Sequence, residues 1–208
     1  MDPAAANEGP RTNDAERASR FAVVVTAGGV ALAAAPFLRP LLQTSSATAA
    51  SKAQDARILQ LVLELEYTQV AFYEQALRDA SLKGDLRRFA RTALGHERQH
   101  LAAVKKALGS KAGARPKVDF GAKTKSAAAF RKAAIQLEDI AVAGYNGQAT
   151  NLTKGTLAVA AEIVSVEARH AAWVRAIADE VAAPDPVDQP MTAQQVVAGL
   201  QQIGLKAS

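Results

Sequence analysis

Apolar residues recur every three or four positions along four long stretches of the chain, which is the spacing of one face of an α-helix. This pattern predicts four helices, over about residues 54–79, 85–108, 126–150 and 153–183. Asp85 and Ser126 are placed to cap the second and third helices, and Gly109 marks the end of the second. No stretch alternates apolar and polar residues over a useful length, so we expect no β-sheet.

The connections between these stretches predict their arrangement. The links between helices 1 and 2 and between helices 3 and 4 are short, which makes each pair neighbours. The middle link is long enough, at about 3.3 Å per residue, to run the length of a bundle. We therefore predict an all-α fold, a four-helix bundle with a long crossover between the second and third helices. A short fifth helix follows, capped by Thr192, with an apolar stripe of Val196, Val197, Leu200 and Ile203.

The chain divides into an N-terminal segment, the bundle, and a linker with the short helix: residues 1–50, 51–183 and 184–208. An uncharged apolar run over residues 21–38 follows Arg17 and Arg20 and precedes Ala47-Thr48-Ala49. A basic flank, an apolar core and an Ala-x-Ala site are typical of a secretory signal peptide, so we expect an exported protein. Two alternatives stay open: an uncleaved membrane anchor formed by the same run, and a cytoplasmic protein with an apolar N-terminal helix.

Composition narrows the function classes. The chain has no Cys, which excludes a disulfide scaffold, thiolate metal sites and thiol catalysis. The net charge is +5, and the excess lies between Lys105 and Lys132, where nine Lys/Arg stand against one acid, Asp119. We interpret this segment as a solvated basic loop, with a phosphate-rich or anionic-lipid partner as the alternative. Only Phe120 and Phe130 interleave with these charges, so we expect no specific nucleic-acid partner.

The strongest chemical signal is a pair of Glu-x-x-His motifs, Glu97 to His100 and Glu167 to His170. Residues three apart lie on the same face of a helix, one turn apart, so both side chains of a pair can reach one metal ion. These motifs use two of the three histidines in the chain. The third, His96, points about 100° away from Glu97 around the helix, so we interpret it as a surface or rim residue.

Each of the four long helices also carries one Glu on its apolar stripe: Glu66, Glu97, Glu138 and Glu167. Buried, unpaired charges are strongly unfavourable, and no Lys or Arg shares these stripes. Four carboxylates and two divalent cations are together charge-neutral, and the two His nitrogens complete the ligand set. Oxygen ligands with some imidazole suit Fe or Mn, with Zn as a further option. We therefore predict a site for two metal ions, with Fe first and Mn second.

The two halves of the bundle carry the same string of residues. Glu66 is followed seven positions later by Tyr73, and Glu138 is followed seven positions later by Tyr145. A Glu-x-x-His motif follows each pair about thirty residues on. We expect a pseudo-twofold bundle in which each tyrosine hydrogen-bonds a carboxylate of the opposite half, with rim packing as the alternative. Trp173 is interpreted as a packing residue rather than an electron relay.

Between about Lys52 and Ala183 the chain resembles the ferritin-like superfamily of di-metal carboxylate proteins, which includes bacterioferritin and rubrerythrin. It resembles in particular the exported ferritin-like family that includes desiccation-related proteins, also in the Pro-Met-Thr-Ala-Gln-Gln-Val segment from Pro190. The resemblance implies that Glu97 and Glu167 bridge two metal ions. It implies these terminal ligands: Glu66 and His100 for one metal, and Glu138 and His170 for the other.

One functional hypothesis leads and two others stay open. The first is a di-iron or di-manganese protein that oxidises Fe(II) or reduces oxygen or peroxide in stress protection. The second is a non-enzymatic envelope protein, related to stress or desiccation, whose metal only holds the bundle together. The third is a binding module for anionic surfaces. An N-terminal leader and an added C-terminal segment fit a monomer or dimer better than a sealed cage.

Overall fold

The computed structural model describes residues 50–206, and its regular structure is helical. The long helices are α3 (Lys52–Asp79), α4 (Gly84–Leu108), α5 (Ala127–Gln148), α6 (Lys154–Ile177) and α7 (Ala193–Ile203). Short 3-10 turns are η2 (Gly109–Lys111), η3 (Gly121–Thr124) and η4 (Ala149–Asn151). The all-α prediction is confirmed, and the leader expected at residues 21–38 lies outside the described residues. Within the described residues no helix is long and apolar enough to cross a membrane.

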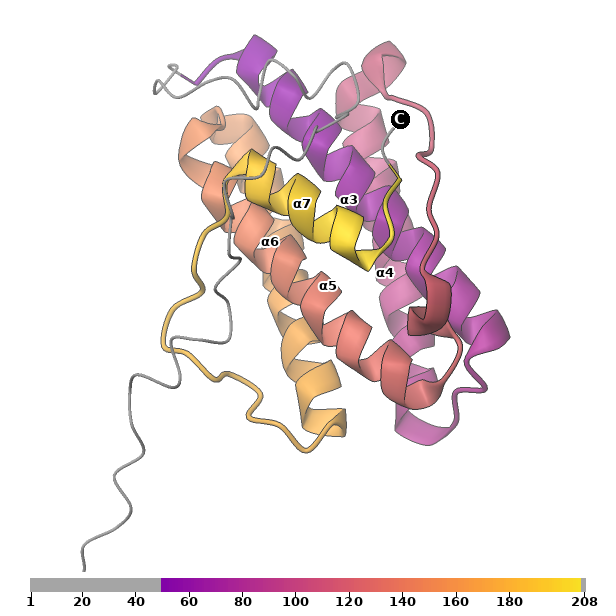
Figure 1. Cartoon of the computed structure of the whole chain (residues 1–208). Coiled ribbons are helices and arrows are strands. Elements are labelled where there is room, and N and C mark those ends of the chain that lie inside the picture. Colours follow the sequence, from indigo (N-terminus) through magenta and orange to yellow (C-terminus); the bar gives the residue numbers. More distant parts are fainter. Residues whose placement is uncertain (1–49, 207–208) are drawn as a thin grey trace, which may run out of the picture. The chain divides into compact units, whose positions relative to one another are not determined.

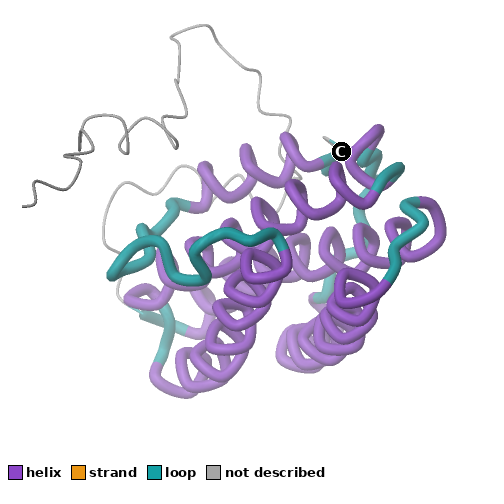
Figure 2. The backbone as a smooth tube through the Cα atoms, turned by 90° about the horizontal axis from the view of Figure 1, so that it is seen from below, coloured by secondary structure: helices purple, strands orange, loops and turns teal. Residues whose placement is uncertain are grey.

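The helices α3 to α6 form a four-helix bundle (Figures 1 and 2). The most extensive contacts join α3 to α4 and α5 to α6, the two pairs connected by short links. The bundle is closed by α4 against α6 and by α3 against α5. As a result α3 and α6 lie diagonally across the interior, and side chains from all four helices can converge there.

The caps predicted for α5 and α7 are confirmed. Ser126 accepts a hydrogen bond from the backbone N–H of Ala129 at the start of α5. Thr192 and Gln195 bond each other's backbone N–H groups reciprocally at the start of α7. Gly109 ends α4 with a φ of 56°, a conformation that residues with a Cβ rarely adopt.

The start of α4 differs from the prediction, and α6 is capped from another helix. α4 already starts at Gly84, so Asp85 is not its cap but lies in the first turn. There its negative charge interacts favourably with the positive end of the helix dipole. Thr153 precedes α6, but its side chain does not cap that helix. Instead, the Asp55 carboxylate of α3 accepts hydrogen bonds from the Thr153 backbone N–H (2.9 Å) and from the hydroxyls of Thr153 and Thr156 (2.5 and 2.7 Å).

The crossover between α4 and α5 is joined to the C-terminal segment by backbone hydrogen bonds. The N–H of Asp119 donates to the Gly204 carbonyl (2.7 Å), and the N–H of Lys206 donates to the Lys117 carbonyl (3.0 Å). The predicted apolar stripe of α7 is buried, and α7 lies across α5 and α3 (Figure 1). The fifth helix is therefore packed against the bundle rather than extended from it.

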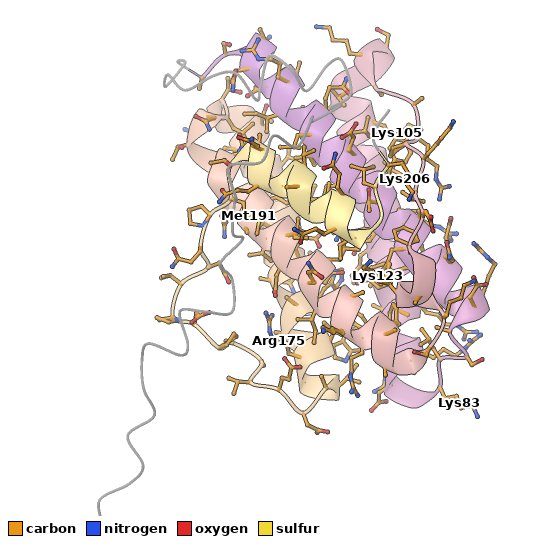
Figure 3. The ribbon with its side chains drawn as sticks, viewed as in Figure 1. Lys83, Lys105, Lys123, Arg175, Met191 and Lys206 are labelled. Atoms are coloured by element: carbon orange, nitrogen blue, oxygen red, sulfur yellow. The ribbon has the colours of Figure 1, made fainter. Side chains whose placement is uncertain are left out.

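The linker before α7 approaches the α5 backbone closely. Met191, labelled in Figure 3, donates its backbone N–H to the carbonyl of Ala143 (2.9 Å). A Cβ added at Gly147 would lie 1.8 Å from the Met191 carbonyl oxygen, so only glycine allows this approach. Gly147 therefore determines where the linker meets the bundle.

The outer face of α3 is covered by the crossover and by α7. Gln60 donates to the Lys111 carbonyl, and Gln75 donates to Thr124 at 2.8 Å. Glu64 lies on this face and is only 7 % exposed, although it stands outside the apolar stripe. Burial raises the pKa of Glu64 to about 7. Thus α3 is buried on all sides, which an amphipathic pattern alone does not predict.

Candidate metal centre

The acidic stripe residues of the four helices meet in the middle of the bundle. Glu66 comes from α3, Glu138 from α5, and the two Glu-x-x-His motifs from α4 and α6. The four carboxylates are fully buried, and both histidines are nearly so. Each helix contributes them because a Glu within an apolar stripe must follow that stripe into the interior.

The six side chains form two overlapping clusters. One contains Glu66, Glu97, His100 and Glu167, and the other contains Glu97, Glu138, Glu167 and His170. In each cluster one ligand atom per residue lies within 4.8 Å of all the others. Ligands about 2.1 Å from a common metal ion lie about 3 to 4 Å from one another, so each cluster has the size of one ion's ligand shell.

Glu97 and Glu167 belong to both clusters, and their oxygens lie between the two imidazole rings. Nδ1 of His100 is 2.9 Å from Glu97 Oε2 and 2.8 Å from Glu167 Oε1. Nδ1 of His170 is 3.0 Å from Glu97 Oε1. The structure thus brings together all six residues that the sequence predicts as ligands, with the two shared carboxylates in the centre.

Buried polar atoms without a hydrogen bond give independent support for metal binding by these residues. Glu66 Oε2, Glu97 Oε1, Glu167 Oε1 and His170 Nδ1 are buried, yet none makes a hydrogen bond. Glu97 Oε1 and His170 Nδ1 approach to 3.0 Å without the geometry of a hydrogen bond. Buried polar atoms left unpaired are costly, and atoms that converge on a common point are what metal coordination requires.

The charges of the cluster are unbalanced without a cation. Burial and the neighbouring charges of Glu167 and Glu97 raise the pKa of Glu66 well above its usual value. Burial alone would lower the pKa of both histidines, but the adjoining carboxylates raise it to about 10 for His100 and about 12 for His170. The carboxylates therefore attract positive charge strongly, whether from protons on the rings or from metal ions.

Each tyrosine of the repeat reaches across the bundle. Tyr73 of α3 donates its hydroxyl to Glu138 of α5, and Tyr145 of α5 donates to Glu66 of α3 at 2.6 Å. Burial raises the pKa of Tyr145 well above its usual value, so its hydroxyl keeps its proton and acts as a donor. The two carboxylates are thereby oriented by the opposite half of the chain.

Two further polar residues contact the cluster, and sequence reasoning did not assign them this role. Gln69, fully buried on α3, donates to Glu167 (3.0 Å) and to Glu138 (3.4 Å). His96, half-buried on α4, has its Nδ1 2.9 Å from Nε2 of His170. Gln69 carries a signal in hindsight, because it stands three positions after Glu66, as the histidines stand after their Glu. His96 carries none, because its partner is on another helix.

A surface pocket leads to the two histidine rings. It lies between α4 and α6 and is lined by His96, Gln99, His100, Val166, Arg169, His170 and Trp173. The Trp173 ring packs edge-on against Phe89, with 5.4 Å between ring centroids. Small polar molecules can therefore approach the cluster along the seam between α4 and α6.

A family model of the ferritin-like domain matches residues 54–180 of the chain. The chain belongs to the ferritin-like domain family. A sequence search finds no curated protein that matches it. In this ferritin-like protein the matched range contains all but the first two residues of α3, the whole of α4, α5 and α6, and all six residues of the two clusters.

Proposed function

We propose that the protein binds two divalent metal ions, Fe or Mn, and oxidises Fe(II) or reduces oxygen or peroxide in stress protection. In this proposal Glu97 and Glu167 would hold both ions, Glu66 and His100 would hold one of them, and Glu138 and His170 would hold the other. The observation that carries it is the pair of overlapping clusters, in which four buried oxygen and nitrogen atoms converge without making a hydrogen bond. Ferritin-like membership supports the same reading.

The residues of the chain would have three tasks. The carboxylates neutralise the metal charge, and the metals when bound supply one-electron chemistry with oxygen or peroxide. Tyr73, Tyr145 and Gln69 hold the carboxylate oxygens in place by donating hydrogen bonds to them. The pocket between α4 and α6 admits small polar molecules, and the apolar interior keeps bulk water from the remaining faces.

A second candidate is a purely structural metal site in an exported protein related to stress or desiccation. The observation that favours it is that the six residues come from all four helices, so bound metal would hold the bundle together. Export rests on the apolar run at residues 21–38. Fractionation of cells that make the full chain tests this part, and mature protein found only in the cytoplasm would contradict it.

Elemental analysis of the natively purified protein, followed by stopped-flow oxidation of added Fe(II), tests the main proposal. We expect about two metal ions per chain and a rate that falls at least about tenfold in Glu97→Ala. The matched control is Glu162→Ala, because Glu162 is exposed on α6 and belongs to neither cluster. Equal consumption of Fe(II) and peroxide by wild type and Glu97→Ala would refute the enzyme. Tightly bound metal without turnover would support the structural candidate instead.

A further inference from the structure

A cavity of about 150 Å³ lies among α3, α4, α5 and α6, apart from the surface pocket beside the histidines. It adjoins the half of the cluster that contains Glu66. Tyr145, which donates its hydroxyl to Glu66, forms part of its wall, and so does Val104, one helical turn from His100. The cavity is therefore next to the candidate metal centre but contains none of its six residues.

The wall of this cavity is almost entirely apolar. The Tyr145 hydroxyl is engaged with Glu66, and the Thr156 hydroxyl donates to Asp55. One polar group remains: the Gln148 side chain, which is 5 % exposed and makes no hydrogen bond with any residue that the structure describes. Its lining includes the exposed residues Ala103, Ala107, Gly155 and Val159, so the cavity opens to solvent along α4 and α6. A volume of about 150 Å³ is enough for a molecule the size of benzene.

The internal repeat explains why this space is open on one side of the cluster only. Eight positions before Glu97 stands Phe89, which is fully buried and lies 6.4 Å from the His170 ring. Eight positions before Glu167 stands Val159, which lines the cavity. A valine thus occupies the position that a phenylalanine fills in the other half.

At two more positions of the repeat, a large aromatic residue in one half corresponds to a smaller residue in the other half. Phe130, eight positions before Glu138, corresponds to Ile58, eight positions before Glu66. Trp173, three positions after His170, corresponds to Ala103, three positions after His100. Ile58 and Ala103 both line the cavity, whereas Phe130 and Trp173 pack with Phe89.

We infer that this cavity is a binding site for one small, uncharged organic molecule of about the size of a benzene ring. Its apolar body would contact α3, α4 and α6, and one hydroxyl or carbonyl group would bond the Gln148 amide. The lining favours an uncharged ligand, because the cavity offers no charged side chain to pair with an ion. The Gln148 amide, which makes no hydrogen bond within residues 50–206, favours a phenol-like molecule over a pure hydrocarbon.

An NMR titration of the full-length protein with benzene and with phenol tests this inference. We expect both to bind, phenol more tightly, and we expect Val159→Phe to abolish binding by placing the ring of the other half in the cavity. Ile58→Phe is a second variant that fills the cavity, in case the new ring at position 159 turns toward solvent instead of into the cavity. The matched control is Ala158→Phe, because Ala158 is exposed on α6 and does not line the cavity.

Gln148→Leu distinguishes the contribution of the amide to binding from that of the apolar wall. Benzene binding should be kept, while the Kd of phenol should rise about tenfold through loss of one hydrogen bond. No saturable binding of either probe to wild type, or binding unchanged in both filling variants, would overturn the inference. The site does not depend on metal, so protein found to contain none should still bind the probes. Failure of the metal proposal therefore leaves this test intact.

Discussion

Nδ1 of His96 lies 2.9 Å from Nε2 of His170, and the two rings are nearly parallel, with 5.1 Å between their centroids. Nδ1 of His170 faces the carboxylates, so its Nε2 is free to donate a proton to His96. His100 has no such partner among the described residues, because Val166 stands where the repeat would place a second His96. The two halves of the candidate centre are therefore chemically unequal.

Removing this hydrogen bond should weaken one half of the centre selectively. In His96→Leu we expect metal affinity at the His170 side to fall about 10- to 100-fold, because the ring loses the group that orients it. Titration calorimetry should then resolve one tight and one weak site per chain. His96→Gln, which can still accept the proton, should largely restore affinity, and Gln99→Leu in the same pocket should change neither site. Equal weakening of both sites would contradict a role through His170.

The crossed tyrosines should contribute to the stability of the metal-free protein. In Tyr145→Phe the buried Glu66 carboxyl group loses a hydrogen bond and is left unpaired, which should lower the free energy of unfolding by about 1 to 3 kcal/mol. Urea unfolding in the presence of a chelator measures this. Tyr67→Phe is the control, because the Tyr67 hydroxyl makes no hydrogen bond with the described residues. An equal loss in both variants would show that the hydroxyl of Tyr145 is not what matters.

The Asp55 cap should make stability depend on acid pH. Burial alone would raise the pKa of Asp55, but hydrogen bonds from Thr153 and Thr156 outweigh it and hold the pKa below the ordinary 3.8. The stabilisation is therefore fully present well above pH 3.8 and is lost as the pH falls through the lowered pKa. Asp55→Ala should cost about 1 to 2 kcal/mol at pH 7, and this difference should begin to shrink as the pH falls below 3.8.

Urea titrations of wild type and Asp55→Ala between pH 7 and pH 3 check this prediction. Asp85→Ala serves as the control, because Asp85 lies in the first turn of α4 and pairs with Arg88 at the surface. A constant difference between Asp55→Ala and wild type over the whole range would show that the charge of Asp55 is not involved.

Replacing Glu64 should stabilise the protein at alkaline pH. Burial raises its pKa from 4.5 to about 7, so the folded state favours the protonated carboxyl. Stability from this group is present below pH 4.5 and is lost as the pH rises through 7. Glu64→Gln should therefore raise the free energy of unfolding by up to about 3 kcal/mol at pH 8, at about 1.4 kcal/mol per pKa unit.

The same variant should have little effect at pH 4, where wild-type Glu64 is protonated in both states. Glu162→Gln, at an exposed position of α6, should change stability at neither pH. Stabilisation by Glu64→Gln that is equal at pH 4 and pH 8 would point to packing rather than to the buried charge.

Much of the bundle could be predicted from the sequence because a helix repeats every 3.6 residues. That period placed each Glu of the four stripes on the face that becomes the core, and it placed each histidine one turn from its Glu. The caps Ser126 and Thr192 were also predictable, because each acts within its own first turn. Features of this kind depend only on neighbours along one helix.

Contacts between helices were decided by the tertiary structure. Asp55 caps α6 from α3, and His96 meets His170 across the seam between α4 and α6. Glu64 is buried in the folded chain, although its own helix leaves it outside the apolar stripe. The periodicity of one helix says which face a residue occupies. Which residue of another helix lies opposite depends on how the helices pack, and only the folded chain determines that.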